Sequence, residues 1–262
     1  DLSIHMEPGE PSIEDFDCNL AEFMDDSALQ SLAGDLDDDI DTDKSSRKDW
    51  EKAYTEGLKL LGLQYEERTE PWNGACGVFH PMITEAVVRF QSEAITETFP
   101  AQGPVKTKII GKMDDLKADT AERKKDFLNW QITEQIEEFR DEEEQLLTQL
   151  PLGGSQYFKL WFDEEKKRPV VEFLPIDRVI LPFAATNFYT AQRAAEIHEI
   201  TSYEFDRRIR NGMYRDISYV KASMTIDQTK VEKANNKVEG KQAEENKDGL
   251  RKVYHIYTWL EL

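Results

Sequence analysis

The chain of 262 residues is poor in the side chains that hold metals or form disulfides. It contains two cysteines and four histidines, namely Cys18, Cys76, His5, His80, His198 and His255. The cysteines form no CxxC pair, and no two histidines stand three or four residues apart, as zinc ligands on a helix commonly do. We therefore expect no metal ligand among these residues, no cofactor, and a reducing compartment.

Long apolar runs are also missing. No stretch of about 18 apolar residues occurs, so we expect no membrane span. The first 17 residues lack the cationic and apolar regions of a signal peptide. The phosphate-binding pattern GxxxxGK followed by Ser or Thr does not occur either. The glycine pair at 153–154 follows an expected helix instead of preceding one, which indicates a helix end and not a phosphate loop.

Basic residues are absent from the first 43 positions, which carry 15 Asp or Glu residues and a charge of −15. Positions 44–262 carry 38 acidic and 33 basic residues, a charge of only −5. This distribution divides the chain into an acidic N-terminal arm, 1–43, and a body, 44–262. A strong acidic balance disfavours a protein that gains its affinity by neutralising nucleic-acid phosphates.

Two patterns occur within the acidic arm. Apolar residues at near-helical spacing predict a short amphipathic helix that docks on another surface; they are Leu20, Phe23, Met24, Leu29, Leu32 and Leu36. The aspartates at 37–43 lack the central glycine and terminal glutamate of a calcium loop. We interpret them as a solvated spacer.

The body has the pattern of an α+β fold with long helices and short antiparallel strands. Apolar spacing and capping residues predict helices at 46–61, 81–99, 119–150 and 201–211, and a helix followed by a mobile loop within 225–250. The charged stretch EEFRDEEEQ at 137–145 leaves two alternatives for the helix 119–150, a local break or a locally exposed helix. Strands are predicted at 105–110, 156–162, 169–175, 194–200 and 252–262. The second and third of these strands form a hairpin around the charged turn 163–168.

The sequence PWNGACGVFHP at 71–81 contains the candidate residues for enzyme chemistry. They are the thiol of Cys76 and the imidazole of His80. A nucleophilic cysteine needs a base within hydrogen-bond reach and a third group that orients this base, and no Asn or Asp is matched to His80. A cysteine between glycines also suits a tight loop, and Gly74 and Gly77 are expected to need positive φ or a close backbone approach. We therefore prefer a structural role and assign no catalytic residue.

Basic residues of the body occur in short stretches at 106–112 and 164–169, surrounded by acidic or apolar residues. Trp130, Phe158, Trp161 and Phe162 stand at spacings typical of core residues. Stacking of nucleic-acid bases needs exposed aromatic side chains beside a basic groove. We therefore expect core aromatics and a solvated hairpin turn instead of a nucleic-acid-binding surface.

Several segments carry a family resemblance through their order. They are NLAEFMDDSALQSLAGDLDDDI at 19–40, SSRKDWEKAYTEGLKLLGLQYEERTEPWNGACGVFHPMITEAVVRFQSEAITETFPAQGPVKTKIIGK at 45–112, NWQITEQIEEFRDEEEQLLTQLPLGGSQYFKLWFDEEKKRPVVEFLPIDRVILPFAA at 129–185, and GMYRDI at 212–217. In this order they resemble the N-terminal part of portal proteins of tailed bacteriophages, in one podovirus-like family. The resemblance covers roughly residues 12–262. Linked segments in one order are more specific than any single motif.

The resemblance implies a structural virion protein whose residues 44–262 form a portal wing-like α+β region. Portal subunits form a ring, typically a dodecamer, at the unique capsid vertex, through which double-stranded DNA is packaged and ejected and to which the tail attaches. The implied location is the virion, and the host cytoplasm during assembly. The family has no catalytic, cofactor or metal residues to carry over. Its chains are longer, so we expect stem, clip and crown regions beyond Leu262.

The resemblance also implies the partners of the chain. These are further copies of the chain in a ring, the terminase motor, the major capsid or scaffolding protein and head–tail adaptor proteins, with DNA passing through the channel without sequence-specific binding. We expect the charged residues 142–144 of the helix 119–150 to support subunit packing. Two alternatives stay open, another head–tail adaptor or virion interaction protein, and a thiol hydrolase that uses Cys76 and His80.

Overall fold

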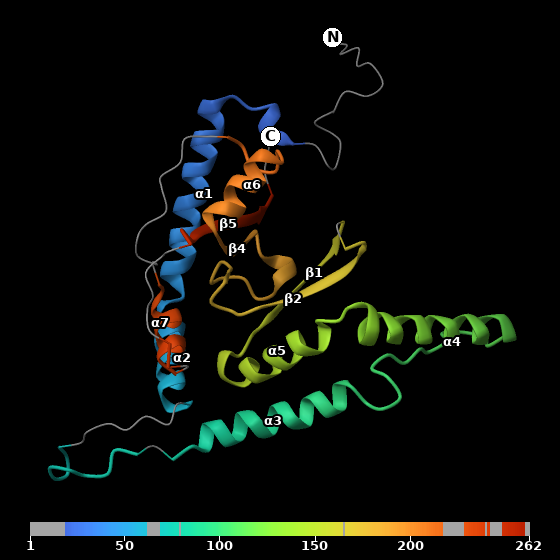
Figure 1. Ribbon diagram of the computed structural model, residues 1–262, viewed down its shortest axis with the longest axis horizontal. Coiled ribbons are helices and arrows are strands. Elements are labelled where there is room, and N and C mark those ends of the chain that lie inside the picture. The colour runs from blue at the N-terminus through green and yellow to red at the C-terminus, as the bar shows by residue number, and fades with distance from the viewer. Residues whose placement is uncertain are drawn as a thin grey trace. The chain divides into compact units, whose positions relative to one another are not determined.

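Helices dominate the chain, and two small antiparallel sheets complete an α+β fold, which confirms the predicted class (Figure 1). The computed structural model describes residues 19–61, 69–78, 80–164, 166–216, 228–238, 240–241 and 248–259. Within these ranges about 52% of residues are helical and 16% are in strands. None of the helices in these ranges is both long and apolar enough to cross a membrane. The chain divides into two compact units, 1–46 and 47–262.

The first unit contains a 3-10 turn at Leu20–Glu22 and the helix α1, Asp26–Ser46. Asp25 caps α1, because its Oδ1 accepts a hydrogen bond from the Ala28 N–H at 2.7 Å. An aspartate at this position satisfies one of the N–H groups that the first turn of a helix leaves without a partner. The helix predicted in the acidic arm therefore exists, and it is longer than the apolar spacing suggested.

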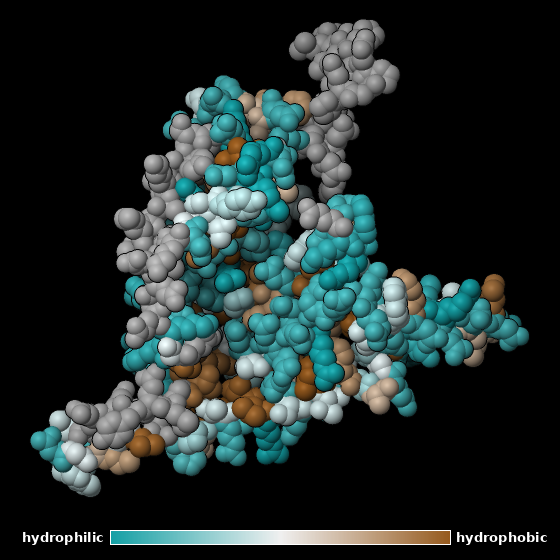
Figure 2. Space-filling model, viewed as in Figure 1, coloured by the Kyte–Doolittle hydropathy of each residue, from teal (hydrophilic) through white to brown (hydrophobic). Residues whose placement is uncertain are grey.

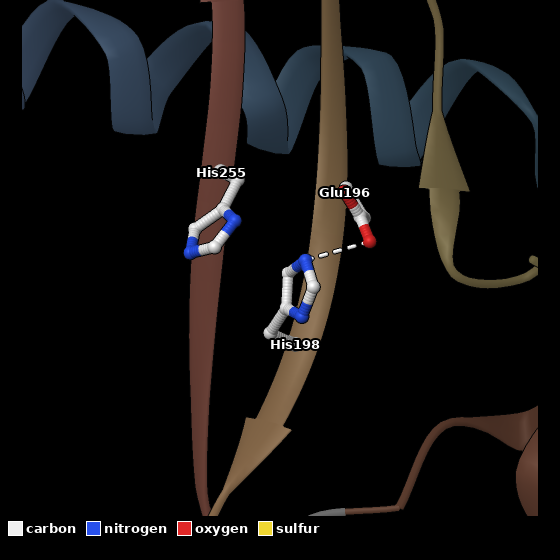
Figure 3. A group of neighbouring side chains, drawn as sticks. All are labelled: Glu196, His198 and His255. Carbon is white, nitrogen blue, oxygen red and sulfur yellow. Dashed lines mark ion pairs between the residues drawn. The ribbon is translucent and has the colours of Figure 1, made fainter. Parts of the chain in front are cut away.

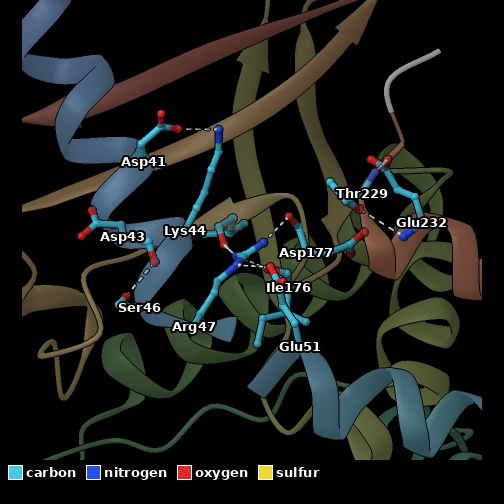
Figure 4. A network of polar contacts seen from close by, with 11 residues as sticks. Asp41, Asp43, Lys44, Ser46, Arg47, Glu51, Ile176, Asp177, Thr229 and Glu232 are labelled. Atoms are coloured by element: carbon cyan, nitrogen blue, oxygen red, sulfur yellow. Dashed lines mark hydrogen bonds and ion pairs between the residues drawn. The ribbon is translucent and has the colours of Figure 1, made fainter. Parts of the chain in front are cut away.

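The aspartate-rich stretch 37–43 belongs to α1, so its prediction as a spacer is wrong. Leu36 and Ile40 keep a four-residue apolar spacing through the aspartates, and Ile40 is buried. Asp41 also pairs with Lys44 at 3.5 Å (Figure 4). The predicted end of the acidic arm consequently falls inside a continuous helix.

The second unit begins with α2, Lys48–Leu61, which packs against α7, Lys230–Val238. Both helices were predicted. Most of the mobile loop predicted after the second helix, within 225–250, lies outside the described residues. Trp50 stacks on Tyr54 with 5.1 Å between ring centroids. The shared core consists of buried Tyr54, Leu58 and Val231, with Trp50, Leu61, Leu152, Ala234 and Val238 packed around them.

The single helix predicted at 119–150 is two helices separated by a π-helical turn. Helical backbone ends at Ile136, with φ −95° and ψ 82°, where the side chain is buried. Next to it, Glu138 pairs with Arg168 at 2.9 Å. These two anchors turn the chain although the helical spacing of the sequence continues. The elements are α4, Asp115–Trp130, the π turn Gln131–Gln135, and α5, Phe139–Gly153.

The helix α3, Met82–Thr98, packs against α5. It confirms the helix predicted to begin at Pro81. Phe99 meets the ring of Phe139 edge-on at 6.0 Å. Gln91 donates to Glu144 Oε1 at 2.9 Å. Glu142 Oε2 accepts the Phe173 N–H at 2.7 Å. Two of the three glutamates expected to support subunit packing therefore hold α5 to its own chain.

The prediction of a strand at 105–110 is wrong, because this segment has no regular secondary structure and pairs with no strand in the described part of the chain. Its backbone pairs with a side chain of α4 instead. Asn129 Oδ1 accepts the Val105 N–H at 2.8 Å, and Asn129 Nδ2 donates to the Val105 carbonyl at 3.2 Å. Gly103 permits this approach, because its φ is +90° and a Cβ there would lie 2.6 Å from Asn129.

The two sheets are antiparallel and contain the hairpin and the two later strands that the sequence predicts. β1, Tyr157–Asp163, pairs with β2, Arg168–Leu174, and the register places Lys159 opposite Glu172. The second sheet has the order β3-β4-β5. Its strands are β3, Val179–Ile180, β4, Arg193–Ile200, and β5, Arg251–Thr258, with a 3-10 turn at Phe188–Thr190 before β4.

Arg47, one residue before α2, fastens that helix to the turn between β2 and β3 (Figure 4). Its Nε also pairs with Glu51 at 3.2 Å. A planar guanidinium suits several acceptors at once, whereas an ammonium would offer no fixed fork. The guanidinium donates to three backbone carbonyls, those of Ile176 at 3.3 Å, Asp177 at 3.0 Å and Val179 at 2.8 Å.

Candidate functional site

Glu196, His198 and His255 meet on one face of the three-stranded sheet (Figure 3). Side chains two residues apart on a strand point to the same face, so Glu196 and His198 of β4 lie together. The register pairs Glu196 directly with His255 of β5. One ligand atom from each of the three side chains lies within 4.8 Å of the others. The sheet backbone thus fixes a cluster of two imidazoles and one carboxylate.

Lys159 brings a positive charge from the hairpin to this cluster. Its Nζ donates to Glu196 Oε2 at 2.6 Å and lies 3.3 Å from His198 Nε2. His198 Nε2 also lies 2.6 Å from Glu196 Oε1. This last contact is an ion pair, and the buried Oε1 accepts no hydrogen bond of good geometry. The two oxygens of one carboxylate therefore differ in how they are satisfied.

Glu196 is charged although only 5% of its surface is exposed. Burial by itself would raise the pKa of its carboxyl group. The hydrogen bond from Lys159 and the closeness of His198 outweigh this cost and lower the pKa below its ordinary value. The central strand β4 therefore carries a negatively charged carboxylate, and the side chains of Lys159, His198 and His255 surround it.

His255 is also deprotonated, but in its case this leaves a neutral ring, and the main cause is burial. Burial lowers the pKa of its imidazole to about 4, and electrostatic interactions with the nearby His198 and Lys159 add to this effect. The two imidazole rings lie 4.1 Å apart between centroids. His255 is therefore neutral at physiological pH, with a lone pair on one of its ring nitrogens.

The helix α6, Ser202–Arg210, supports His255 through the turn that follows it. The side chain of Thr201 caps α6 by accepting the Glu204 N–H at 3.2 Å, which confirms the predicted capping residue. Arg208 Nη1 donates to the hydroxyl of Tyr214 at 2.8 Å, and this hydroxyl lies 3.2 Å from His255 Nε2. A hydrogen-bonded chain from α6 therefore fixes the orientation of the His255 ring.

A pocket of about 390 Å³ between the hairpin and the sheet reaches the cluster. Lys159 and Glu196 contribute to its lining, whereas His198 and His255 do not. Most of the remaining lining is apolar or aromatic and comes from Tyr157, Leu160, Leu174, Val179, Phe188 and Tyr257.

Cys76 and His80 lie in the loop before α3, and both are exposed. Among the described contacts, no hydrogen bond joins the two side chains. Gly74 has φ +82°, as its place in this loop predicted, while Gly77 is buried. Among the described residues none forms a hydrogen bond that would orient His80, so this pair is a weaker candidate than the cluster on the sheet.

A second surface of interest is α4, in which no residue is buried. Large apolar side chains are exposed on or beside it: Leu116 is 74% exposed and Phe127 is 55% exposed. Figure 2 shows isolated brown patches among mostly teal atoms at this helix. The expectation that Trp130, Trp161 and Phe162 are core residues is wrong, because all three are exposed, whereas Phe158 is half-buried. The helical or strand spacing of the three exposed residues is regular, but no element within the described ranges buries them.

The cluster is not evident from histidines at helical spacing, because its residues lie on strands. Glu196 and His198 are two residues apart in a predicted strand, and His255 lies in another predicted strand. Pairing these strands in antiparallel register would have revealed the site, whereas Lys159 joins through tertiary packing alone. His5 and Cys18 lie outside the described residues. A scan against models of known protein families and a search of curated proteins give no match to the chain.

Proposed function

We propose that this protein is a subunit of the ring-shaped portal at the unique vertex of a tailed-bacteriophage capsid. Double-stranded DNA passes through the ring during packaging and ejection, and the tail attaches to it. The protein acts as a structural virion component and not as an enzyme. The proposal is supported by the ordered segments at 19–40, 45–112, 129–185 and 212–217 that resemble portal proteins.

The observation that carries this proposal is the uncovered α4 helix. A helix of 16 residues without a buried side chain gains little stability from its own chain. Exposed large apolar side chains such as Leu116 and Phe127 commonly mark surfaces that bind another protein. In a ring, the copy next to each subunit supplies the missing cover for this helix.

The charge of the chain suits a DNA channel that holds no DNA tightly. The formal net charge is −20, and negative walls repel phosphates at short range. Further copies, the terminase motor, the capsid or scaffolding protein and adaptor proteins are the proposed partners. The virion is the proposed location, with assembly in the host cytoplasm.

Electron microscopy and mass photometry of the protein expressed from its complete gene test the proposal. We expect closed rings, typically of twelve subunits, with a central channel. Phe127→Glu should reduce the fraction of rings while leaving the circular dichroism spectrum unchanged, because Phe127 is exposed in the single chain. Glu122→Lys, a charge change at a polar position of the same helix, serves as the control. A protein that stays monomeric at all concentrations would contradict the portal assignment.

A further inference from the structure

We propose that Glu196, His198 and His255 bind one divalent transition-metal ion, with Zn²⁺ preferred. Two imidazoles and one carboxylate form a donor set that Zn²⁺ uses with water as the fourth ligand. All three side chains lie on one face of two paired strands, within 4.8 Å of one another at their ligand atoms. This site does not depend on the portal assignment, because it is built entirely from one chain.

The spacing of the donor atoms suits a single ion. Bonds of about 2.0–2.1 Å to Zn²⁺ in a tetrahedron place ligand atoms about 3.3 Å apart. Glu196 Oε1 and His198 Nε2 are 2.6 Å apart, slightly closer than this spacing. No donor pair exceeds 4.8 Å. Rotation of side chains, without movement of the strands, is therefore enough to complete the site.

The satisfaction of the Glu196 carboxylate also points to a cation in the cluster. Glu196 is nine-tenths buried, and its Oε1 has His198 Nε2 as an ion-pair partner at 2.6 Å (Figure 3) but accepts no hydrogen bond of good geometry. Buried polar atoms without a hydrogen bond are uncommon and costly, and each calls for a physical explanation. A bound cation between Oε1 and the imidazoles would satisfy this oxygen.

Tyr214 acts as an outer-shell partner of the site. Its hydroxyl lies 3.2 Å from His255 Nε2. When Nε2–H donates to this hydroxyl, the lone pair of the ring is on Nδ1 and available to the metal. Arg208 donates to the same hydroxyl at 2.8 Å, which fixes its position. Outer-shell hydrogen bonds of this kind orient metal-binding histidines and set their tautomer.

Lys159 competes with the metal for the carboxylate. Its ammonium donates to Glu196 Oε2 at 2.6 Å and is close to His198, so it supplies the positive charge of the cluster. Its side chain is 24% exposed, and the ring of Trp161, 5.7 Å from Nζ, offers another position. Metal binding and the contact between hairpin and sheet are therefore linked through one side chain.

Titration of the chelator-treated full chain with Co²⁺, followed by displacement with Zn²⁺, tests the site. We expect saturation at one ion per chain and the visible absorption bands of tetrahedral cobalt. Because the proposed ligands are nitrogen and oxygen, no thiolate-to-cobalt band should occur. A thiolate band would assign the ion to a cysteine instead and overturn the proposal, as would the absence of saturable binding.

Matched variants locate the ion. Glu196→Gln and His255→Ala should each weaken Co²⁺ and Zn²⁺ binding by about tenfold or more. His80→Ala removes an exposed histidine outside the site and should leave the affinity unchanged. Lys159→Met removes the competing ammonium and should tighten binding by about tenfold. Unchanged binding in His255→Ala, or unchanged or weaker binding in Lys159→Met, would contradict the proposal.

An NMR measurement on the wild-type chain tests the site even if the variants fail to fold. Co²⁺ is paramagnetic and shifts or broadens the NMR signals of nearby protons. In the wild-type chain, two imidazole ring systems should respond at one equivalent of Co²⁺, while the ring of His80 should not. Histidine signals that all stay unchanged, or a response at His80 alone, would overturn the site.

Discussion

The helices α2 and α4 have similar lengths, 14 and 16 residues, but opposite surroundings. In α2, Tyr54 and Leu58 are buried against α7. In α4 no residue is buried, and Phe127 remains exposed. Apolar spacing therefore predicts that a segment is helical, but burial depends on whether the chain supplies a partner for the apolar face. For α2 this partner is in the same chain, and for α4 we propose that it is in the next subunit.

The largest expected difference between α2 and α4 is the loss of unfolding free energy when an aromatic side chain is replaced by alanine. Tyr54→Ala should lower the free energy of unfolding by about 3 kcal/mol, because it leaves a cavity beside Trp50 and Val231. Phe127→Ala should change it by less than about 0.5 kcal/mol. Denaturant unfolding of the dissociated chain measures both values. Equal costs would show that α4 is covered within its own chain.

Two arginines sharpen the same contrast. Arg47→Met removes donors from three backbone carbonyls and should cost about 2 kcal/mol of unfolding free energy. Arg89→Met breaks only the exposed pair with Glu93 at 3.1 Å and should cost about 0.3 kcal/mol. Thermal and denaturant unfolding of the two variants provide the comparison. A loss at Arg89 as large as that at Arg47 would contradict the role given to the carbonyl contacts.

Alanine substitutions at two glycines near α4 distinguish the effect of backbone strain from the effect of side-chain crowding. Gly103 and Gly111 have φ of +90° and +92°, but only a Cβ at Gly103 would meet Asn129, at 2.6 Å. Gly111→Ala should cost about 1 kcal/mol from strain, and Gly103→Ala about 2 kcal/mol because Asn129 must also give up Val105. Hydrogen exchange at the Val105 amide should rise only in Gly103→Ala. No change there would show that Asn129 does not hold the segment.

The smallest effect is expected at Asp177, next to the Arg47 contacts. Burial raises the pKa of its carboxyl group, and the nearby charge of Glu232 adds to this. The folded state therefore holds a proton that the unfolded state releases above about pH 3.9. The unfolding free energy falls as the pH rises from there to the folded pKa. Asp177→Asn should gain stability relative to wild type between pH 3 and pH 7; a constant difference would exclude this linkage.

The sequence was sufficient for most helices, the β1–β2 hairpin and the strands β4 and β5, because local spacing and caps such as Thr201 determine them. It failed where a long-range contact decides. Ile136 and the Glu138–Arg168 pair end a helix whose spacing continues. Asn129 pairs with a segment that has strand-like alternation. The cluster of Glu196, His198 and His255 likewise depends on the pairing of β4 with β5, which a single strand does not reveal. No sequence pattern near Lys159 predicts that it contacts Glu196 from the other sheet.

Hydroxyl-radical footprinting of Phe127 in the dissociated and assembled protein tests the central claim most directly. Phe127 is 55% exposed in the single chain, so we expect its modification to fall several-fold when the ring forms. Tyr54, buried in both states, is the internal reference and should stay weakly modified. Equal modification of Phe127 in both states would contradict the account that a neighbouring subunit covers α4.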